Sequence, residues 1–276
     1  MREPNHMRRI VLIWAALTVI VLPLILFVFD ADLPPGRDSD DAGGQVVDQT
    51  VLYAVAIPVA LALFVYFAYV LIVFRARGPE PGEGVKIPED RRLVRVWLIA
   101  TASIALGLAA YGTVRLLDGG GGGGQGPDPL SKPDGEPLEV QVIGQQWDFT
   151  YRYPSFGGVE TPQLVLPVDR EVELHVTSLD VVHSFWAYEL GVKADASPGD
   201  DNVAYVKPSE TGAFEVRCAE LCGLWHGYMY DSGGRVVTDS EFQTWVRQQQ
   251  QLFAPATSVL PPYSHEYFPP PERRAG

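Results

Sequence analysis

Three long apolar runs lie before residue 118, and none of them contains an ionisable side chain. They occupy residues 10–29, 51–74 and 96–114. Because a helix of about 20 apolar residues crosses the hydrocarbon core of a bilayer, each run is long enough to span a membrane. We therefore expect transmembrane helices in the first part of the chain and a separate domain after them.

The first run has a second interpretation. It follows Arg8 and Arg9, and a basic start before an apolar segment is also the pattern of a secretory signal peptide. No small-residue cleavage motif follows the run. We favour a retained helix over residues 1–29, which gives three spans. Cleavage would leave two, in a transmembrane hairpin at residues 51–117.

Charges between the runs predict their orientation. Residues 75–95 carry six Lys and Arg, whereas residues 30–50 carry six Asp and a single Arg. Since basic loops stay on the cytoplasmic side, residues 75–95 and the N-terminus are predicted to be cytoplasmic. Residues 30–50 then form an acidic outer loop, and everything after residue 118 lies outside.

The exported part is strongly acidic. Residues 118–276 hold 23 Asp and Glu against 10 Lys and Arg. Such a field repels nucleic acid and steers a basic protein partner towards it. An acidic surface also simply keeps a protein soluble, so charge alone does not identify the partner.

A glycine-rich stretch separates the helices from the exported domain. Six consecutive glycines begin at Gly119, and we interpret residues 118–137 as a flexible linker. After them, apolar and polar residues alternate in short runs separated by Pro, Gly and Asp, which predicts an all-β sandwich or barrel over residues 138–253. The predicted strands begin at Leu138, Glu171, Asn202, Gly212 and Arg235. A short helix runs from Asp239 towards Gln251, and residues 254–276 form a Pro-rich tail.

One segment of this domain concentrates side chains that bind soft metals. It contains Cys218, Cys222, His226 and Met229 directly after a predicted strand. Thiolates suit copper, and a weak Met ligand is typical of electron-transfer copper sites. Zinc does not normally take Met, a blue-copper site needs a single Cys, and a disulfide would leave the His and Met unexplained. The pattern therefore favours two copper ions bridged by two thiolates.

A second imidazole is expected from an upstream segment. His183 lies at the end of a predicted strand, and in a sandwich such a residue can lie beside a downstream loop. Taken alone, His183 is equally well explained as a core histidine, and the metal loop favours a ligand. His175 lies on the polar face of its strand and is expected to be solvated.

Together these residues resemble subunit II of the haem-copper cytochrome c oxidases, whose cupredoxin domain, a Greek-key β-sandwich, holds the binuclear CuA centre. The family's loop C-x-E-x-C-x-x-x-H-x-x-M falls on Cys218, Glu220, Cys222, His226 and Met229. Its D-V-x-H-S motif falls on residues 180–184, and its G-x-K-x-D-A-x-P-G run falls on residues 191–199. The resemblance covers the two later spans and residues 138–237.

The resemblance implies a role for each matched residue. Cys218 and Cys222 supply bridging thiolates, Glu220 a backbone carbonyl, His183 and His226 terminal imidazoles, and Met229 an axial thioether. It also implies that the Glu220 side chain reaches a magnesium or manganese ion shared with subunit I. In the matched motif G-x-Q-W-x-W-x-Y, Trp147 is the residue through which cytochrome c delivers its electron.

The implied function is that of an electron-relay subunit of cytochrome c oxidase in a bacterial plasma membrane. Electrons from a c-type cytochrome pass through CuA to haem in subunit I, where oxygen is reduced to water with proton translocation. Subunit III is a further expected partner. The alternatives are a membrane-tethered copper carrier or sensor, and a copper-free quinol oxidase subunit II that acts as a scaffold.

Three positions depart from the family pattern. Phe149 replaces a second Trp, which is expected to keep an aromatic surface. Arg152 stands where an acidic docking residue is common. Val94 stands where a carboxylate often precedes the helix that Trp97 opens, and Glu89 or Asp90 is a possible substitute.

Overall fold

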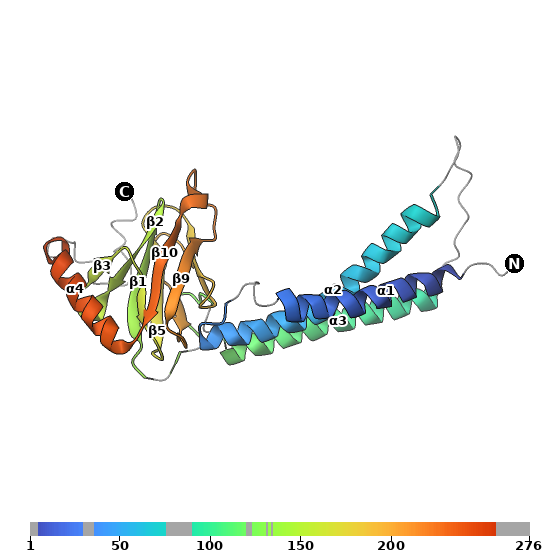
Figure 1. The fold of residues 1–276 in the computed structure, drawn as a ribbon, viewed down its shortest axis with the longest axis horizontal. Helices are drawn as coiled ribbons and strands as arrows, with labels where there is room; N and C mark the ends of the chain where they lie inside the picture. The colour runs from blue at the N-terminus through green and yellow to red at the C-terminus, as the bar shows by residue number, and fades with distance from the viewer. Residues whose placement is uncertain are drawn as a thin grey trace. The chain divides into compact units, whose positions relative to one another are not determined.

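The computed structural model of the chain describes residues 5–29, 36–75, 90–119, 123–130, 132–133 and 135–257. The chain forms two compact units. The first unit contains residues 1–33 and 47–114, and the second contains residues 34–46 and 115–276. Figure 1 labels the helices of the first unit and several strands of the second, numbered in chain order.

Three helices confirm the predicted spans. They are α1 (His6–Leu24), which continues as the π-helix η1 (Ile25–Phe29), α2 (Asp40–Val73) and α3 (Arg91–Gly119). All three are long and apolar enough to cross a membrane. Helix α2 begins earlier than expected, so residues 40–50 of the predicted outer loop are helical.

The start of α3 explains the role of Asp90. Its Oδ1 accepts hydrogen bonds from the backbone N–H groups of Arg92 at 2.9 Å and Leu93 at 3.1 Å. These bonds satisfy donors that the first turn of a helix leaves unpaired. Asp90 therefore caps α3, and this structural role accounts for the carboxylate. Glu89 lies outside the described residues.

Side chains of α1 are fixed against α2. The indole Nε1 of Trp14 donates to the carbonyl oxygen of Pro58 at 2.8 Å. The ring Nδ1 of His6 lies 2.8 Å from the hydroxyl of Tyr69. In an apolar medium each such bond replaces an unsatisfied polar group, so the pairing favours helix association.

We expect α1 to remain in the mature protein, because these bonds give it a fixed place in the helical unit. Mass spectrometry of the purified full chain should recover a peptide that contains Trp14. A mature chain that begins after residue 29 would contradict this prediction and leave the two-span arrangement.

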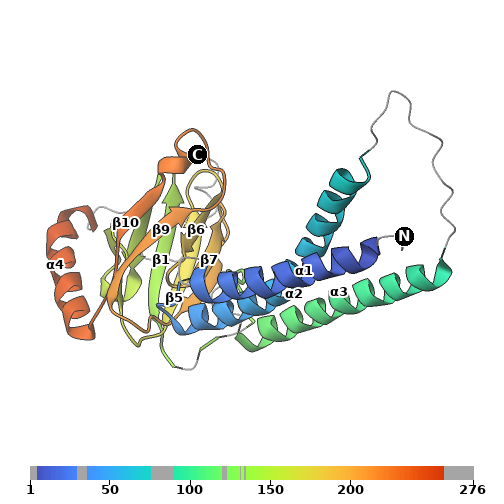
Figure 2. The same cartoon turned by 45° about the vertical axis from the view of Figure 1, so that its right-hand side comes forward.

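The second unit contains a sandwich of two five-stranded sheets, with strand orders β3-β2-β1-β5-β8 and β4-β10-β9-β6-β7. Figure 2 shows β10, β9, β6 and β7 side by side in one layer. The strand bounds are β1 Leu138–Gln145, β2 Asp148–Tyr153, β3 Val159–Thr161, β4 Val165–Pro167, β5 Val172–Ser178, β6 His183–Ala187, β7 Val192–Ala196, β8 Asn202–Val206, β9 Gly212–Cys218 and β10 Tyr230–Val237. The predicted sandwich is confirmed, and β1, β5, β8, β9 and β10 are the strands that alternation predicted.

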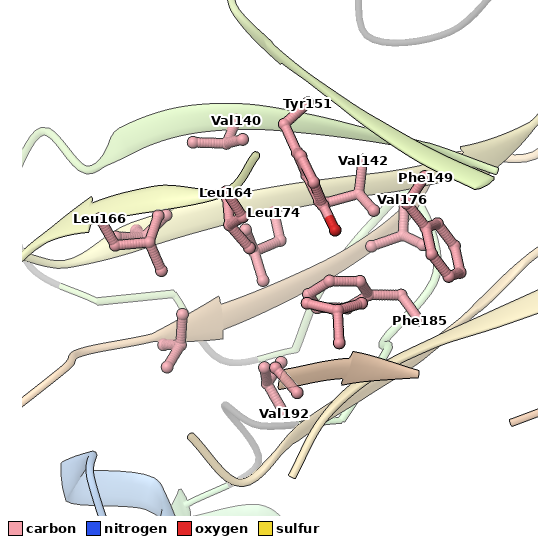
Figure 3. Packing of buried hydrophobic residues seen from close by; sticks show 14 of the residues in the cluster. Val140, Val142, Phe149, Tyr151, Leu164, Leu166, Leu174, Val176, Phe185 and Val192 are labelled. Atoms are coloured by element: carbon pink, nitrogen blue, oxygen red, sulfur yellow. The ribbon is translucent and has the colours of Figure 1, made fainter. Parts of the chain in front are cut away.

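Aromatic and aliphatic side chains fill the space between the sheets. Figure 3 shows Phe149, Tyr151 and Phe185 directed into this core among valines and leucines. Phe149 is 1% exposed and meets Phe185 edge to face, with ring centroids 5.9 Å apart. The expectation of an aromatic surface at Phe149 is therefore wrong. Alternate residues of β2 face inward, and this register buries it.

Helix α4 (Asp239–Thr257) follows the last strand and packs beside β3 and β4. A capping box begins it, because Glu241 Oε2 accepts from Thr238 N–H at 3.0 Å and Thr238 Oγ1 accepts from Glu241 N–H at 3.4 Å. Phe242, fully buried, packs against Tyr153. The helix extends beyond the predicted end, and the tail from residue 258 lies outside the described residues.

Where the structure describes the predicted linker, its backbone is hydrogen-bonded to the β-domain. Gly124 N–H donates to the carbonyl of Lys193 at 3.0 Å, and Gln125 N–H donates to that of Val203 at 2.9 Å. Gly124 lies so close to Asn202 that a Cβ would meet its side chain at 2.5 Å. Glycine therefore permits this segment to lie along β7 and β8, in place of a flexible tether.

His175 is buried and not solvated as expected. It is 5% exposed, and its Nδ1 lies 2.8 Å from Asp201 Oδ2. The side chains of Glu173 and Asp201 lie against its ring on the outer face of the sheet. Alternation assigned the face of the strand correctly, but it could not reveal this cover.

Candidate metal centre

Strand pairing places the first two predicted ligands together. His183 opens β6, rather than ending a strand as predicted, and Cys218 ends β9. The two strands are antiparallel neighbours, with Phe185 opposite Cys218. A further bond from Ala219 N–H to Ser184 O, at 2.9 Å, extends this pairing towards the metal loop.

The metal loop, residues 218–229, folds back on itself to place its remaining donors. Cys218 N–H donates to the carbonyl of Met229 at 3.0 Å and closes the loop at its base. Gly223 has φ +119°, a conformation that side-chain-bearing residues rarely adopt. A 3-10 turn, η5 (His226–Tyr228), then directs His226 and Met229 back towards the cysteines.

The donor atoms are spaced as the ligands of metal ions are. Cys218 Sγ lies 3.7 Å from Cys222 Sγ and 3.9 Å from His183 Nδ1. Cys222 Sγ lies 3.5 Å from His226 Nδ1 and 3.7 Å from Met229 Sδ. Two donors that each lie about 2.0–2.3 Å from one ion in tetrahedral geometry are separated by roughly 3.3–3.8 Å. Most of these separations fall within that range, and His183 lies just beyond it.

The backbone of Glu220, and not its side chain, lies next to the donor atoms. Its carbonyl oxygen lies 3.2 Å from Cys218 Sγ, whereas its side chain is exposed. Both cysteines are free thiols, and Cys222 is buried while Cys218 is partly exposed. All predicted ligand positions, His183 and Glu220 included, thus converge on one place at the end of the sandwich.

An aspartate orients the upstream imidazole. Asp180 Oδ1 lies 2.9 Å from His183 Nε2 and, as a carboxylate oxygen, accepts a hydrogen bond from its N–H, which leaves the lone pair of Nδ1 facing Cys218. Burial raises the pKa of Asp180, but hydrogen bonds from Gln146 N–H, His183 and Val181 N–H outweigh it and lower the pKa below its ordinary value. The carboxylate is therefore ionised at neutral pH.

The Cys222 thiol keeps its proton in the metal-free protein. Burial, followed by the contact with Cys218, raises the pKa of Cys222 to about 12. A metal that binds here must displace that proton, so affinity rises with pH.

Trp147, the predicted residue of electron entry, lies beside the metal loop. It is half-buried and meets Trp225 of that loop edge to face, with centroids 6.5 Å apart. Sequence reasoning missed two residues that join it to the centre, Gln146 and Asp180. Gln146 directly precedes Trp147, and Asp180 lies three residues before His183. Their positions next to predicted site residues were the signal that could have identified them.

Exposed apolar side chains surround the centre. On the metal loop these are Leu221, Leu224, Trp225 and Tyr228, with exposed fractions of 77%, 84%, 47% and 72%. Val181 and Val182 of the neighbouring β5–β6 connection are also exposed. Grouped apolar exposure of this kind is typical of interaction surfaces.

Arg152 does not offer its charge to this surface. Its guanidinium is 5% exposed and donates to Glu160 Oε2 at 2.6 Å and to Gln141 Oε1 at 2.7 Å. Thr150 Oγ1 also donates to Glu160, at 2.6 Å. Arg152, which stands where an acidic docking residue is common, is therefore paired with Glu160 within the domain. The pair lies on the outer face of β1, β2 and β3.

Replacing Arg152 by alanine should lower the free energy of unfolding by roughly 2 kcal/mol, because it leaves Glu160 and the buried Gln141 without their partner. This loss of stability is smaller than that expected on breaking a fully buried ion pair, because Glu160 is 25% exposed. Urea unfolding of the full chain, followed by tryptophan fluorescence, measures the change. Arg247→Ala, at an exposed position of α4, should shift it by less than about 0.5 kcal/mol, and equal effects would contradict the prediction.

Comparisons with known proteins find similar sequences and a similar solved structure. Residues 159–232 match the family described as cytochrome c oxidase subunit II, periplasmic domain. Cytochrome c oxidase subunit 2 of Thermostichus vulcanus is 29% identical, over 87% of this chain and 86% of its own length. The protein of that name from Synechocystis is 33% identical over 51% of this chain and 43% of its own. The crystal structure of the periplasmic domain of subunit II of cytochrome oxidase from Bradyrhizobium japonicum is 34% identical, covering 45% of this chain and 98% of that one, with a TM-score of 0.41.

Proposed function

The chain belongs to the cytochrome c oxidase subunit II family, and on that premise we propose that it is the electron-relay subunit of a bacterial cytochrome c oxidase. It accepts electrons from a c-type cytochrome at a binuclear CuA centre and passes them to haem in subunit I. There, oxygen is reduced to water and protons are translocated. In this proposal the cupredoxin-like domain is exported to the outer side of the plasma membrane, which the three helices are long and apolar enough to span.

The observation that carries this proposal is the convergence of soft donors. Two thiols 3.7 Å apart face two imidazoles and a thioether. This donor set suits copper better than zinc, because a thioether is not a usual zinc ligand. A scaffold without copper would not need it, and a carrier that releases metal would not need a ligand loop closed by a backbone hydrogen bond with Cys222 and Met229 buried.

Each ligand residue would have its own role in binding the copper ions. Cys218 and Cys222 would bridge, His183 and His226 would each bind at one end, and Met229 and the Glu220 carbonyl would complete the set. When bound, a copper pair of this kind supplies a one-electron carrier. A preformed loop keeps the ligands in place, so that little rearrangement accompanies a change of charge, and Asp180 fixes the tautomer of His183.

The surface around the centre supports the proposed partners. Trp147 and the exposed apolar side chains of the metal loop form a contact surface for the cytochrome, and the acidic charge of the exported part steers a basic donor towards it. The exposed carboxylate of Glu220 is available for a magnesium or manganese ion shared with subunit I. Subunit III is a further proposed partner.

Copper analysis and electron paramagnetic resonance of the purified full chain, loaded with copper under reducing conditions, test the proposal. We expect two coppers per chain that share one unpaired electron between equivalent nuclei. A single copper with an ordinary mononuclear signal would favour the carrier. A chain without stable copper would favour the scaffold.

A further inference from the structure

Gln146 joins the residue that receives electrons to the ligands of the metal centre. Its side-chain Nε2 donates to the carbonyl oxygen of Cys222 at 2.8 Å. Its backbone N–H donates to Asp180 Oδ2 at 2.7 Å. Asp180 is in turn bonded to His183. One residue next to Trp147 is therefore attached both to the metal loop and to the strand that carries the upstream imidazole.

The packing around this connection is close. A Cβ at Gly223 would lie 2.8 Å from Gln146 Nε2 and 3.4 Å from Trp147 Nε1, so the metal loop approaches both side chains through a glycine. The indole Nε1 of Trp147 is buried and has no hydrogen-bond partner among the described residues. Trp147 is thus held near the loop by packing and by the bonds of Gln146, and not by a bond of its own.

We propose that Gln146 is a positioning residue, which sets the separation between Trp147 and the Cys222 side of the metal loop. The inference rests on the proposed function for its effect on electron transfer, but the connection itself does not depend on copper. Electron tunnelling falls steeply with the gap that the electron crosses. The covalent and hydrogen-bonded path from Trp147 through Gln146 to Cys222 therefore matters to the rate at which the centre is reduced.

A metal-free measurement tests the positioning role. The full chain, reduced and without copper, is labelled with 15N-tryptophan in lipid nanodiscs, and the indole signal of Trp147 is assigned by its loss in Trp147→Phe. In Gln146→Ala we expect the Trp147 indole N–H to exchange with solvent about fivefold faster, since one hydrogen bond that restrains the segment is lost. Gln146→Glu keeps the shape but loses the donor, and should behave in the same way.

A second measurement tests the consequence. In the copper-loaded full chain, Gln146→Ala should be reduced by cytochrome c about tenfold more slowly. Its copper content and resonance signal should remain unchanged. Gln145→Ala, at the exposed neighbouring position, is the matched control and should leave both rates unaltered.

The outcomes are distinguishable. Unchanged indole exchange in both Gln146 variants overturns the positioning role, whatever the copper chemistry. Faster exchange with an unchanged rate of reduction overturns the path through Cys222. A wild-type chain without the two-copper signal overturns the proposed function, and the exchange measurement still decides whether Gln146 holds Trp147.

Discussion

Replacing Cys222 by serine should abolish the two-copper signal and leave at most one copper per chain. Its sulfur lies between Cys218, His226 and Met229, at 3.7, 3.5 and 3.7 Å, so it lies close to three of the other donors. A serine hydroxyl neither ionises near neutral pH nor acts as a soft ligand, and bridging is lost. Copper analysis and paramagnetic resonance of the full-chain variant measure the result.

Two controls separate loss of the ligand from loss of the fold. Serine is close in size to cysteine, so thermal unfolding of the metal-free variant should match that of the metal-free wild type. Met229→Leu removes a weak axial ligand of similar volume and should keep both coppers. A two-copper signal that survives Cys222→Ser would refute the bridging role.

Replacing Trp147 by phenylalanine should slow reduction by cytochrome c about a hundredfold without changing the copper signal. The smaller phenylalanine ring makes less contact with Trp225 and lies farther from Gly223. Loss of close contact between reacting groups has effects of this order. Stopped-flow mixing of reduced cytochrome c with the copper-loaded full chain gives the rate.

Trp186→Phe is the matched control for this substitution. Trp186 is a half-buried tryptophan of β6 that contacts Tyr188 and lies outside the metal loop. Its variant should be reduced at the wild-type rate. Equal slowing in both variants would show that the effect is a general one, and Trp147 would then have no special part in receiving electrons.

Local sequence determined the framework because its signals are short in range. Length and apolarity predicted the spans, and alternation predicted β1, β5, β8, β9 and β10. The short strands β3 and β4 lack enough residues to show a period. In strand β2, Phe149, Tyr151 and Tyr153 face the core. Its sequence was interpreted as an aromatic motif and not as a strand.

The metal loop could be predicted from the sequence because most of its ligands lie within a dozen residues. The chemistry of Cys218, Cys222, His226 and Met229 is carried by residue type and spacing. His183 was different, since it lies 35 residues before Cys218. Only the pairing of β6 with β9 decided that it faces the thiols.

Tertiary structure alone decided what surrounds each side chain. His175 and Arg152 lie on outer strand faces that the sequence marks as polar, but neighbouring strands and Asp201 or Glu160 enclose them. The connection from Gln146 to Cys222 spans 76 residues of sequence. Residue type determines which ligands and spans a chain can form, whereas burial and partner depend on contacts between distant segments, which no local pattern records.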